Sequence, residues 1–251
     1  MQTGAPRHPA RPWAAVARGA RLALCLWLTS PVAAVAQEAV AARYEGAVTR
    51  YPHGVLGDEV EYDTLAVTLS DGRVLRRRWD APLVFEDVAP RLWDVTGDGR
   101  PEIVTVESHE TRGARLAIWT VAEGSLDPLA ATPFIGQRFR WLAPVGAADL
   151  DGDGAIEIAY VDRPHLAKTL RIWRYTDGAM HEVAAAPGFT NHRIGWDYIA
   201  GGLRDCGDGP EMILASGDWS RTVALRFDGR LRARDLGGYS ADRMAAALTC
   251  R

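Results

Sequence analysis

Short apolar runs separated by turn residues recur along the chain and predict β-strands. The runs are rich in β-branched and aromatic side chains and are bounded by Gly, Asp or Pro, which favours strands over helices. Several are apolar at consecutive positions, as expected for strands that are covered on both faces. The predicted strands lie at 103–106, 116–121, 156–161, 170–175, 212–215 and 222–227.

Turns that contain Asp-Gly predict hairpins between neighbouring strands. The sequence Ser70-Asp71-Gly72 separates residues 59–69 from residues 73–79. Two further turns, at 176–178 and 228–229, directly follow predicted strands. Aspartate and glycine in such short connections are typical of antiparallel hairpins.

An acidic segment repeats along the chain with a period of 55 residues. It occupies residues 94–104 and 149–159, and a partly decayed copy, shorter by one residue, occupies 204–213. Trp141 and Trp196 keep the same phase, because each stands eight residues before a copy. Two marks that share one period indicate repeated structural units.

Repeated units that each form a small antiparallel sheet predict an all-β fold, a small β-propeller of about four antiparallel blades. Four blades is few for this architecture. The alternative is therefore an incomplete ring that is closed by sharing of the N- and C-terminal strands or by dimerisation into a homo-oligomer. We expect a propeller domain over 37–236 and a tail over 237–251, with units at about 44–88, 89–143, 144–198 and 199–236.

The second acidic copy places carboxylates at alternate positions of a tight loop. Calcium (Ca2+) takes six to eight hard oxygen ligands, and intervening glycines permit the positive φ values that wrap a backbone around an ion. Carboxylates packed this closely would repel one another without a cation. We therefore predict a calcium site made by Asp149, Asp151, Asp153, the Ala155 carbonyl and Glu157.

The other two copies depart from this pattern. Simple turn formation by Asp and Gly is the alternative for every copy, and it is the preferred interpretation of the third, where Arg204 replaces the first acid and Cys206 the middle one. In the first copy, a threonine replaces the middle carboxylate. Its predicted metal ligands are Asp94, Thr96, Asp98 and Glu102.

Residues 1–36 have the features of a cleavable signal peptide. They contain four arginines, no acid, an apolar run at 22–28 and the sequence Ala34-Val35-Ala36. The run is shorter than the roughly 20 residues that span a bilayer, so no transmembrane span is expected. We therefore expect a periplasmic or secreted protein.

Export also bears on the two remaining cysteines, Cys206 and Cys250. An even pair in an exported protein is more often a disulfide than two free thiols. Such a bond would hold the third loop by a covalent link where the other loops use a metal.

Charge argues against nucleic acid as a partner. The chain has 29 basic and 32 acidic residues, a net charge of −3, and removal of the four arginines in 1–36 leaves −7. Nucleic-acid phosphates require a basic surface. The apolar share of 47% and the charged share of 24% are ordinary for a folded domain.

The pattern Asp-x-Asp-Gly-Asp-Gly-x-x-Glu before a strand, with its Gly146-Ala-Ala-Asp149 lead-in, resembles the calcium loops of FG-GAP/VCBS repeats. These repeats are the units of integrin α-type β-propellers. The resemblance is specific at 149–159, fair at 94–104 and poor at 204–213. It implies calcium binding at Asp149, Asp151, Asp153 and Glu157, and at Asp94, Asp98 and Glu102, in a protein of adhesion or ligand binding.

Every clustered carboxylate falls in a predicted metal loop, so we expect an exported, non-catalytic, calcium-stabilised module with a protein or carbohydrate ligand. The densest polar and aromatic group, at 191–198, could form a sugar- or peptide-binding surface if it lies at the ring axis. The preferred interpretation is that Trp196 packs between blades, as Trp141 is expected to. The alternative is a secreted hydrolase or lyase of carbohydrate with an axial-face active site, which a pair of acids with shifted pKa values outside the loops would favour. The candidate ligand-binding residues are His192, Arg193, Trp196 and Tyr198.

Overall fold

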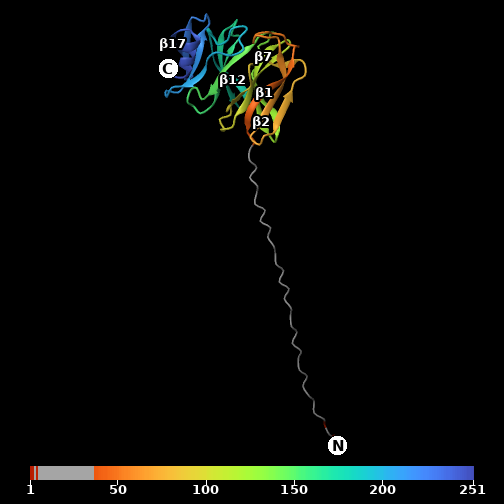
Figure 1. The fold of residues 1–251 in the computed structure, drawn as a ribbon. Helices are drawn as coiled ribbons and strands as arrows, with labels where there is room; N and C mark the ends of the chain where they lie inside the picture. Colours follow the sequence, from red (N-terminus) through yellow and green to blue (C-terminus); the bar gives the residue numbers. More distant parts are fainter. Residues whose placement is uncertain (3, 5–36) are drawn as a thin grey trace. The chain divides into compact units, whose positions relative to one another are not determined.

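The computed structural model describes residues 37–251 together with Met1, Gln2 and Gly4. The predicted signal peptide therefore lies, apart from those three residues, outside the described residues. The described part contains seventeen strands and one helix (Figure 1), which confirms the all-β prediction. No helix in this part is long and apolar enough to cross a membrane.

The first sheet has eight strands, all paired antiparallel, and runs in the order β1-β2-β4-β6-β7-β8, with β3 on β2 and β5 on β6. The three-residue strand β4 links two hairpin systems, because it pairs with β2 on one side and β6 on the other. The strands are β1 (Ala39–Val48), β2 (Glu61–Leu69), β3 (Val74–Arg78), β4 (Leu83–Phe85), β5 (Arg91–Trp93), β6 (Glu102–His109), β7 (Gly113–Ala122) and β8 (Ser125–Ala131).

Two smaller antiparallel sheets follow along the chain. The second is a four-stranded meander of β9 (Leu142–Ala148), β10 (Glu157–Asp162), β11 (Thr169–Thr176) and β12 (Ala179–Pro187). The third contains β13 (Phe189–Thr190), β14 (Gly202–Asp205), β15 (Pro210–Ser216), β16 (Arg221–Phe227) and β17 (Leu231–Gly238). Each of the six predicted strands between 103 and 227 coincides with one of β6, β7, β10, β11, β15 or β16, apart from one residue at the start of 156–161.

The central strands are apolar at consecutive positions because both of their faces are covered. In β10, Ile158 and Tyr160 belong to a cluster with β6 and β7, whereas Ala159 and Val161 belong to a cluster with β15 and β16. Alternate side chains of a strand point to opposite faces, so one strand can contribute to two cores. The sheets are thus packed face to face in chain order, as expected for successive propeller units.

The sheets do not close into a ring, and the described residues form three sheets because the first two predicted units share one. Strand β1 pairs with β2 and β17 pairs with β16, so the two terminal strands do not share a sheet. In Figure 1 they lie on opposite sides of the domain, with β12 between them. The closure by terminal strand sharing that we considered is therefore absent from the described part of the chain.

The expected tail contains a helix that packs on the third sheet. Helix α1 (Ala241–Leu248) is capped by Ser240, whose Oγ accepts a hydrogen bond from Arg243 N at 3.1 Å, the usual arrangement of an N-cap. Met244 and Ala247 are buried against Ile213 of β15. Because β17 continues to Gly238 and the helix completes this core, the residues beyond 236 are part of the domain.

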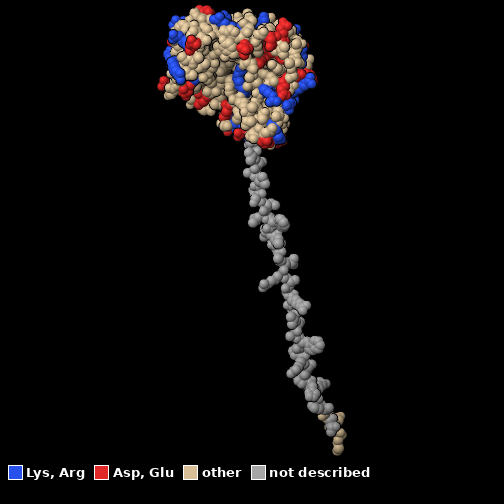
Figure 2. Space-filling model, in the orientation of Figure 1, with Lys and Arg blue, Asp and Glu red and all other residues tan. Residues whose placement is uncertain are grey.

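Acidic and basic side chains are interspersed on the face seen in Figure 2. Ion pairs at the surface include Arg76 with Glu45, 2.9 Å apart, and Arg171 with Glu182, 2.6 Å apart. Water screens exposed pairs of this kind, so these pairs balance charge more than they hold the fold.

Candidate metal centre and binding surface

The loop between β9 and β10 is shaped by Asp149. Its Oδ1 accepts a hydrogen bond from Gly152 N at 2.7 Å and its Oδ2 accepts one from Gly154 N at 3.0 Å. Both glycines have positive φ values, +79° and +89°, which a residue with a Cβ adopts only at a cost. The first aspartate of the motif therefore folds the loop back on itself.

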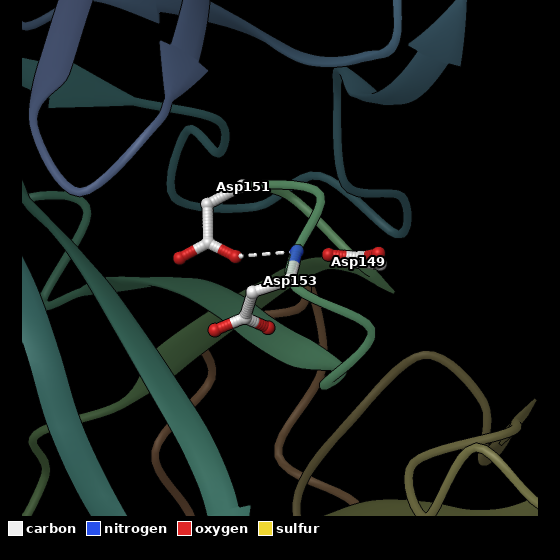
Figure 3. Close-up of side chains that lie close together, drawn as sticks. All are labelled: Asp149, Asp151 and Asp153. Atoms are coloured by element: carbon white, nitrogen blue, oxygen red, sulfur yellow. Dashed lines mark hydrogen bonds between the residues drawn. The ribbon is translucent and has the colours of Figure 1, made fainter.

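Three predicted ligands meet in this loop. Asp149, Asp151 and Asp153 each offer a carboxylate oxygen, and these oxygens lie within 4.8 Å of one another (Figure 3). Asp151 Oδ1 also accepts a hydrogen bond from Asp153 N at 3.3 Å. Ala155 N donates to Asp153 Oδ1 at 2.9 Å, which fixes the outgoing chain.

Glu157 lies at the start of β10 and is fully buried. Its Oε2 accepts a hydrogen bond from Leu150 N at 2.9 Å, and its Oε1 accepts one from Arg174 Nε at 2.5 Å. Burial raises the pKa of Glu157, and the hydrogen bonds from Leu150 and Arg174 oppose that rise. The closing glutamate thus needs a neighbouring positive charge to stay ionised.

Arg174 also holds two of the aspartates. Its Nη2 lies 2.9 Å from Asp151 Oδ2 and its Nη1 lies 2.8 Å from Asp153 Oδ2. The arginine stands directly opposite Glu157 in the β10–β11 ladder. We missed it from sequence because the signal, an arginine opposite the closing acid, depends on the strand register.

The donor set suits a hard cation. It consists of carboxylate oxygens only, from Asp149, Asp151 and Asp153, with Glu157 behind them, and calcium prefers such ligands. The aspartates are partly or fully exposed, so an ion can reach them. A cation held here would share these carboxylates with Arg174.

The first loop, between β5 and β6, folds in the same way but does not gather its acids. Asp94 accepts hydrogen bonds from Gly97 N at 2.7 Å and Gly99 N at 2.9 Å. Asp98 forms an ion pair with Arg100. Glu102 Oε2 accepts hydrogen bonds from the backbone N–H groups of Val95 and Thr96, which directly follow Asp94. Within the described residues, the only set of three metal-ligating side chains brought together in this way is that of the second loop.

Strand pairing corrects our alignment of the third loop, between β14 and β15. Glu211 pairs with Arg204, as Glu157 pairs with Ala148 in the second sheet. The paired positions are nine residues apart in the second loop and seven in the third, so the third is shorter by two residues. Arg204 therefore corresponds to Ala148, and Asp205 occupies the place of the first acid.

Asp205 accepts backbone hydrogen bonds from its own loop, as Asp94 and Asp149 do in the first and second loops. Its Oδ1 accepts hydrogen bonds from Gly207 N at 2.8 Å and from Gly209 N at 3.2 Å. The next residue, Cys206, forms a disulfide with Cys250, with the Cα atoms 5.7 Å apart. The predicted covalent link between this loop and the end of the chain is therefore present.

Glu211, which closes the third loop, is surrounded by arginines. Nε of Arg204 lies 2.9 Å from Oε2, Nη2 of Arg234 lies 3.0 Å from Oε1, and Nε of Arg226 lies 3.1 Å from Oε1. Burial raises the pKa of Glu211, but the three guanidinium groups outweigh it and lower the pKa to about 2. Arg226 corresponds by register to Arg174 of the second loop.

The predicted ligand surface is an aromatic cluster on the third sheet's loops. Trp196 stacks on Tyr198 with ring centroids 4.6 Å apart and meets the edge of Trp219 at 5.2 Å. Trp219 meets Tyr239 at 4.7 Å, and the Arg193 guanidinium lies 4.5 Å from the Trp219 ring centre. We did not predict Trp219 or Tyr239, because they follow Trp196 by 23 and 43 residues and show no shared motif.

His192 lies beneath this surface and not on it. It is fully buried, and its Nε2 donates to the Trp196 carbonyl oxygen at 2.9 Å. Trp196 itself is only partly buried, whereas Trp141 is 2% exposed. The two tryptophans of the repeat phase therefore differ in role, and His192 supports the surface from behind.

Carboxyl groups outside the loops include several with raised pKa values, the feature that would favour catalysis. Burial raises the pKa of Glu61 to about 10, with Glu86 and Asp58 adding to the rise. Glu61 is 3% exposed and Glu86 is fully enclosed. A substrate cannot reach these two acids in this arrangement, so they do not favour the hydrolase or lyase alternative.

Residues 94–160 match the FG-GAP-like repeat. The matched segment runs from Asp94 to Tyr160 and thus includes the first two acidic loops, which confirms the resemblance inferred from the motif. The repeat suggests a protein-binding module of propeller-like fold, and FG-GAP repeats often bind calcium. No curated protein matches the chain.

Proposed function

Since the chain carries an FG-GAP-like repeat, we propose that it is an exported, non-catalytic module that calcium stabilises and that binds a protein or carbohydrate ligand. Residues 1–36 act as the cleaved signal, and the domain begins at residue 37. The disulfide between Cys206 and Cys250 and the FG-GAP-like repeat both fit an extracellular protein. A periplasmic or secreted location follows from this proposal.

The observation that carries the calcium part is the convergence of Asp149, Asp151 and Asp153. Together with Glu157 and the Ala155 carbonyl, they would hold the ion, whose charge offsets the repulsion between the aspartates. The ion would also bind the ends of β9 and β10 together. The first loop, with Asp94, Thr96, Asp98 and Glu102, is a second and weaker candidate for calcium.

Thermal unfolding of the purified protein with calcium and with a chelator tests the calcium part. At a hundredfold excess over Kd, a ligand of the folded state adds about 2.7 kcal/mol to the free energy of unfolding. For a domain of this size that is a rise in Tm of roughly 5–10 °C. Asp153→Asn should abolish the rise.

Asp71→Asn provides the matched control. Asp71 precedes a glycine as Asp153 does, but it stands in the turn between β2 and β3 of the first sheet and is not part of the aspartate cluster. The calcium response of this variant should equal that of the wild type. A Tm that calcium does not change, or a response that survives Asp153→Asn, would contradict the proposal.

The aromatic cluster of Arg193, Trp196, Tyr198, Trp219 and Tyr239 supports the binding part. Tyr198 is 47% exposed, and tyrosine, tryptophan and arginine are enriched where proteins bind one another. Peptides selected from a library on the immobilised protein should bind wild type and lose at least about tenfold in affinity for Arg193→Gln/Tyr198→Ala. Peptides that bind both proteins equally would place the ligand elsewhere.

A further inference from the structure

A hollow of about 260 Å³ lies at the end of the strands away from the acidic loops. Strand β10 begins at Glu157, beside the second acidic loop, and ends at Asp162, beside the loop that lines the hollow. Six strand residues span about 20 Å, so the two places are distinct. Neither the calcium proposal nor the aromatic cluster makes use of this hollow.

His53 forms part of the wall and is held in place from behind. Its Nδ1 forms a hydrogen bond with Oε1 of the fully buried Glu86, whose Oε2 accepts one from Ser108. The Glu86 carbonyl in turn accepts a hydrogen bond from Trp141 Nε1 at 2.8 Å. A carboxylate on Nδ1 fixes the imidazole and leaves Nε2 for another partner.

The Nε2 atom of His53 makes no hydrogen bond within residues 37–251. Phe139 stacks on the ring with centroids 5.1 Å apart, which fixes its plane. The imidazole therefore presents a polar atom to the hollow in a fixed orientation.

The rest of the lining is largely apolar. Val55 and Trp141 are buried in the wall, whereas Leu166 and Ile194 are 62% and 70% exposed. A space of this size accepts a single ring or branched aliphatic group, which the buried aromatic wall would remove from water.

Positive charge without a matching acid lies at the same place. Arg140 lines the hollow, and its Nη1 donates to the Phe139 carbonyl at 2.8 Å, but it forms no ion pair in the described domain. Arg163, which also lines the hollow, is already paired with Asp162 at 2.9 Å. Arg140 is thus available to an anion.

Two wall residues adopt a backbone conformation that only a well-fixed surrounding sustains. Phe139 and Arg163 have φ values of +56° and +47°, in the left-handed region. A residue with a Cβ adopts this region only at a cost, and strain of this kind is common at ligand sites. Phe139 N donates to the Tyr51 hydroxyl at 2.8 Å, which holds that turn.

We propose that this hollow binds an aromatic carboxylate, with its ring against Trp141 and Phe139 and its carboxylate at Arg140. His53 adds a second donor to the carboxylate through Nε2–H when its ring carries a proton on each nitrogen, because Nδ1 faces Glu86. The site is independent of the calcium loop, which lies at the other end of β10. It uses none of the residues of the aromatic cluster, although Ile194 stands on the same loop as Arg193 and Trp196. The combination of an apolar hollow, an unpaired guanidinium and a fixed imidazole favours an apolar anion over a sugar or a neutral ring.

Calorimetric titration of the purified protein with benzoate, benzyl alcohol and acetate tests the site. Benzoate should bind with a Kd on the order of 1 mM or lower, and benzyl alcohol, which has the ring without the charge, at least about tenfold more weakly. Acetate, which has the charge without the ring, should bind more weakly still. A chelator should leave all three results unchanged.

Arg140→Gln should weaken benzoate binding about tenfold and leave benzyl alcohol binding unaltered. Leu166→Trp changes an exposed rim residue, so it should fold normally and obstruct the hollow. Arg230→Gln is the control, because Arg230 is exposed in the β16–β17 turn and lacks an ion pair within the described residues. Absence of benzoate binding, equal binding of benzoate and benzyl alcohol, or full binding by both Arg140→Gln and Leu166→Trp would overturn the proposal.

Discussion

The second and third acidic loops occupy the same place in neighbouring sheets but neutralise their closing glutamate differently. Glu157 has one arginine, Arg174, which it shares with Asp151 and Asp153. Glu211 has three arginines, of which Arg226 also lies 3.9 Å from Asp208, and a disulfide holds the adjoining loop. In both cases a carboxylate is buried at the start of a strand. Burying such a charge alone costs free energy, so each carboxylate requires a positive partner.

The difference between the loops lies in what remains for an outside cation. In the second loop the carboxylates outnumber the arginine, so there is room for a metal. In the third loop three arginines surround Glu211, and Asp205 and Asp208 are not gathered with it into a cluster, so little is left for a metal to bind. The aspartate cluster is thus found in the loop whose glutamate has one arginine and not in the loop whose glutamate has three.

Removal of the disulfide should have the largest effect on stability. The bond closes a segment with a sequence separation of 44, and the chain-entropy model assigns such a link about 4 kcal/mol. Cys206→Ala/Cys250→Ala should lower Tm by roughly 10 °C in a thermal melt. An unchanged Tm would show that the arginines alone hold the third loop.

Glu211 should make the next largest contribution, in a pH-dependent way. Its pKa falls from 4.5 in the unfolded chain to about 2 in the folded protein. Its stabilisation is therefore complete above about pH 4.5 and is lost as the pH falls toward 2, and a shift of this size corresponds to about 3 kcal/mol. Denaturant unfolding of Glu211→Gln should show this deficit at pH 6 and little of it near pH 2.

Asp235→Asn is the control for that experiment. Asp235 also pairs with an arginine, Arg221, but both side chains are about half exposed. Its removal should change stability little at either pH. A Glu211→Gln deficit that is independent of pH would contradict the assigned role of its charge.

Arg174→Gln should have the smallest effect, on calcium affinity. The guanidinium occupies carboxylate oxygens of Asp151 and Asp153 that a cation would use, so its loss should tighten calcium binding about tenfold. Isothermal titration with calcium measures this change. Arg226→Gln, which alters the corresponding arginine of the third loop, should leave calcium affinity as in the wild type; weaker binding by Arg174→Gln would show that the arginine supports the site.

Much of the fold could be predicted from the sequence, because strands covered on both faces leave continuous apolar runs such as 212–215 within β15. The 55-residue period located the acidic loops, and the pair of cysteines indicated their bond. We did not predict helix α1, because it stands in a segment that we treated as a tail. Ser240, its N-cap residue, was the available signal.

What the sequence could not supply depends on register and on contacts between distant segments. The place of Asp205 follows only from the pairing of Glu211 with Arg204. His53 and Glu86 are 33 residues apart and meet through the packing of loops, which no local pattern records. Ion pairs and hydrogen bonds between such distant residues depend on strand register and on loop packing, which the sequence does not show.

The short strand β4 has a consequence for how the domain comes apart. Tyr62 of β2 pairs with Phe85, and Leu83 pairs with His109 of β6, so one ladder of amides runs from β1 to β8. The N-terminal half of the domain should therefore open as one cooperative block in hydrogen exchange, while the two later sheets, each with its own ladder, are free to open separately.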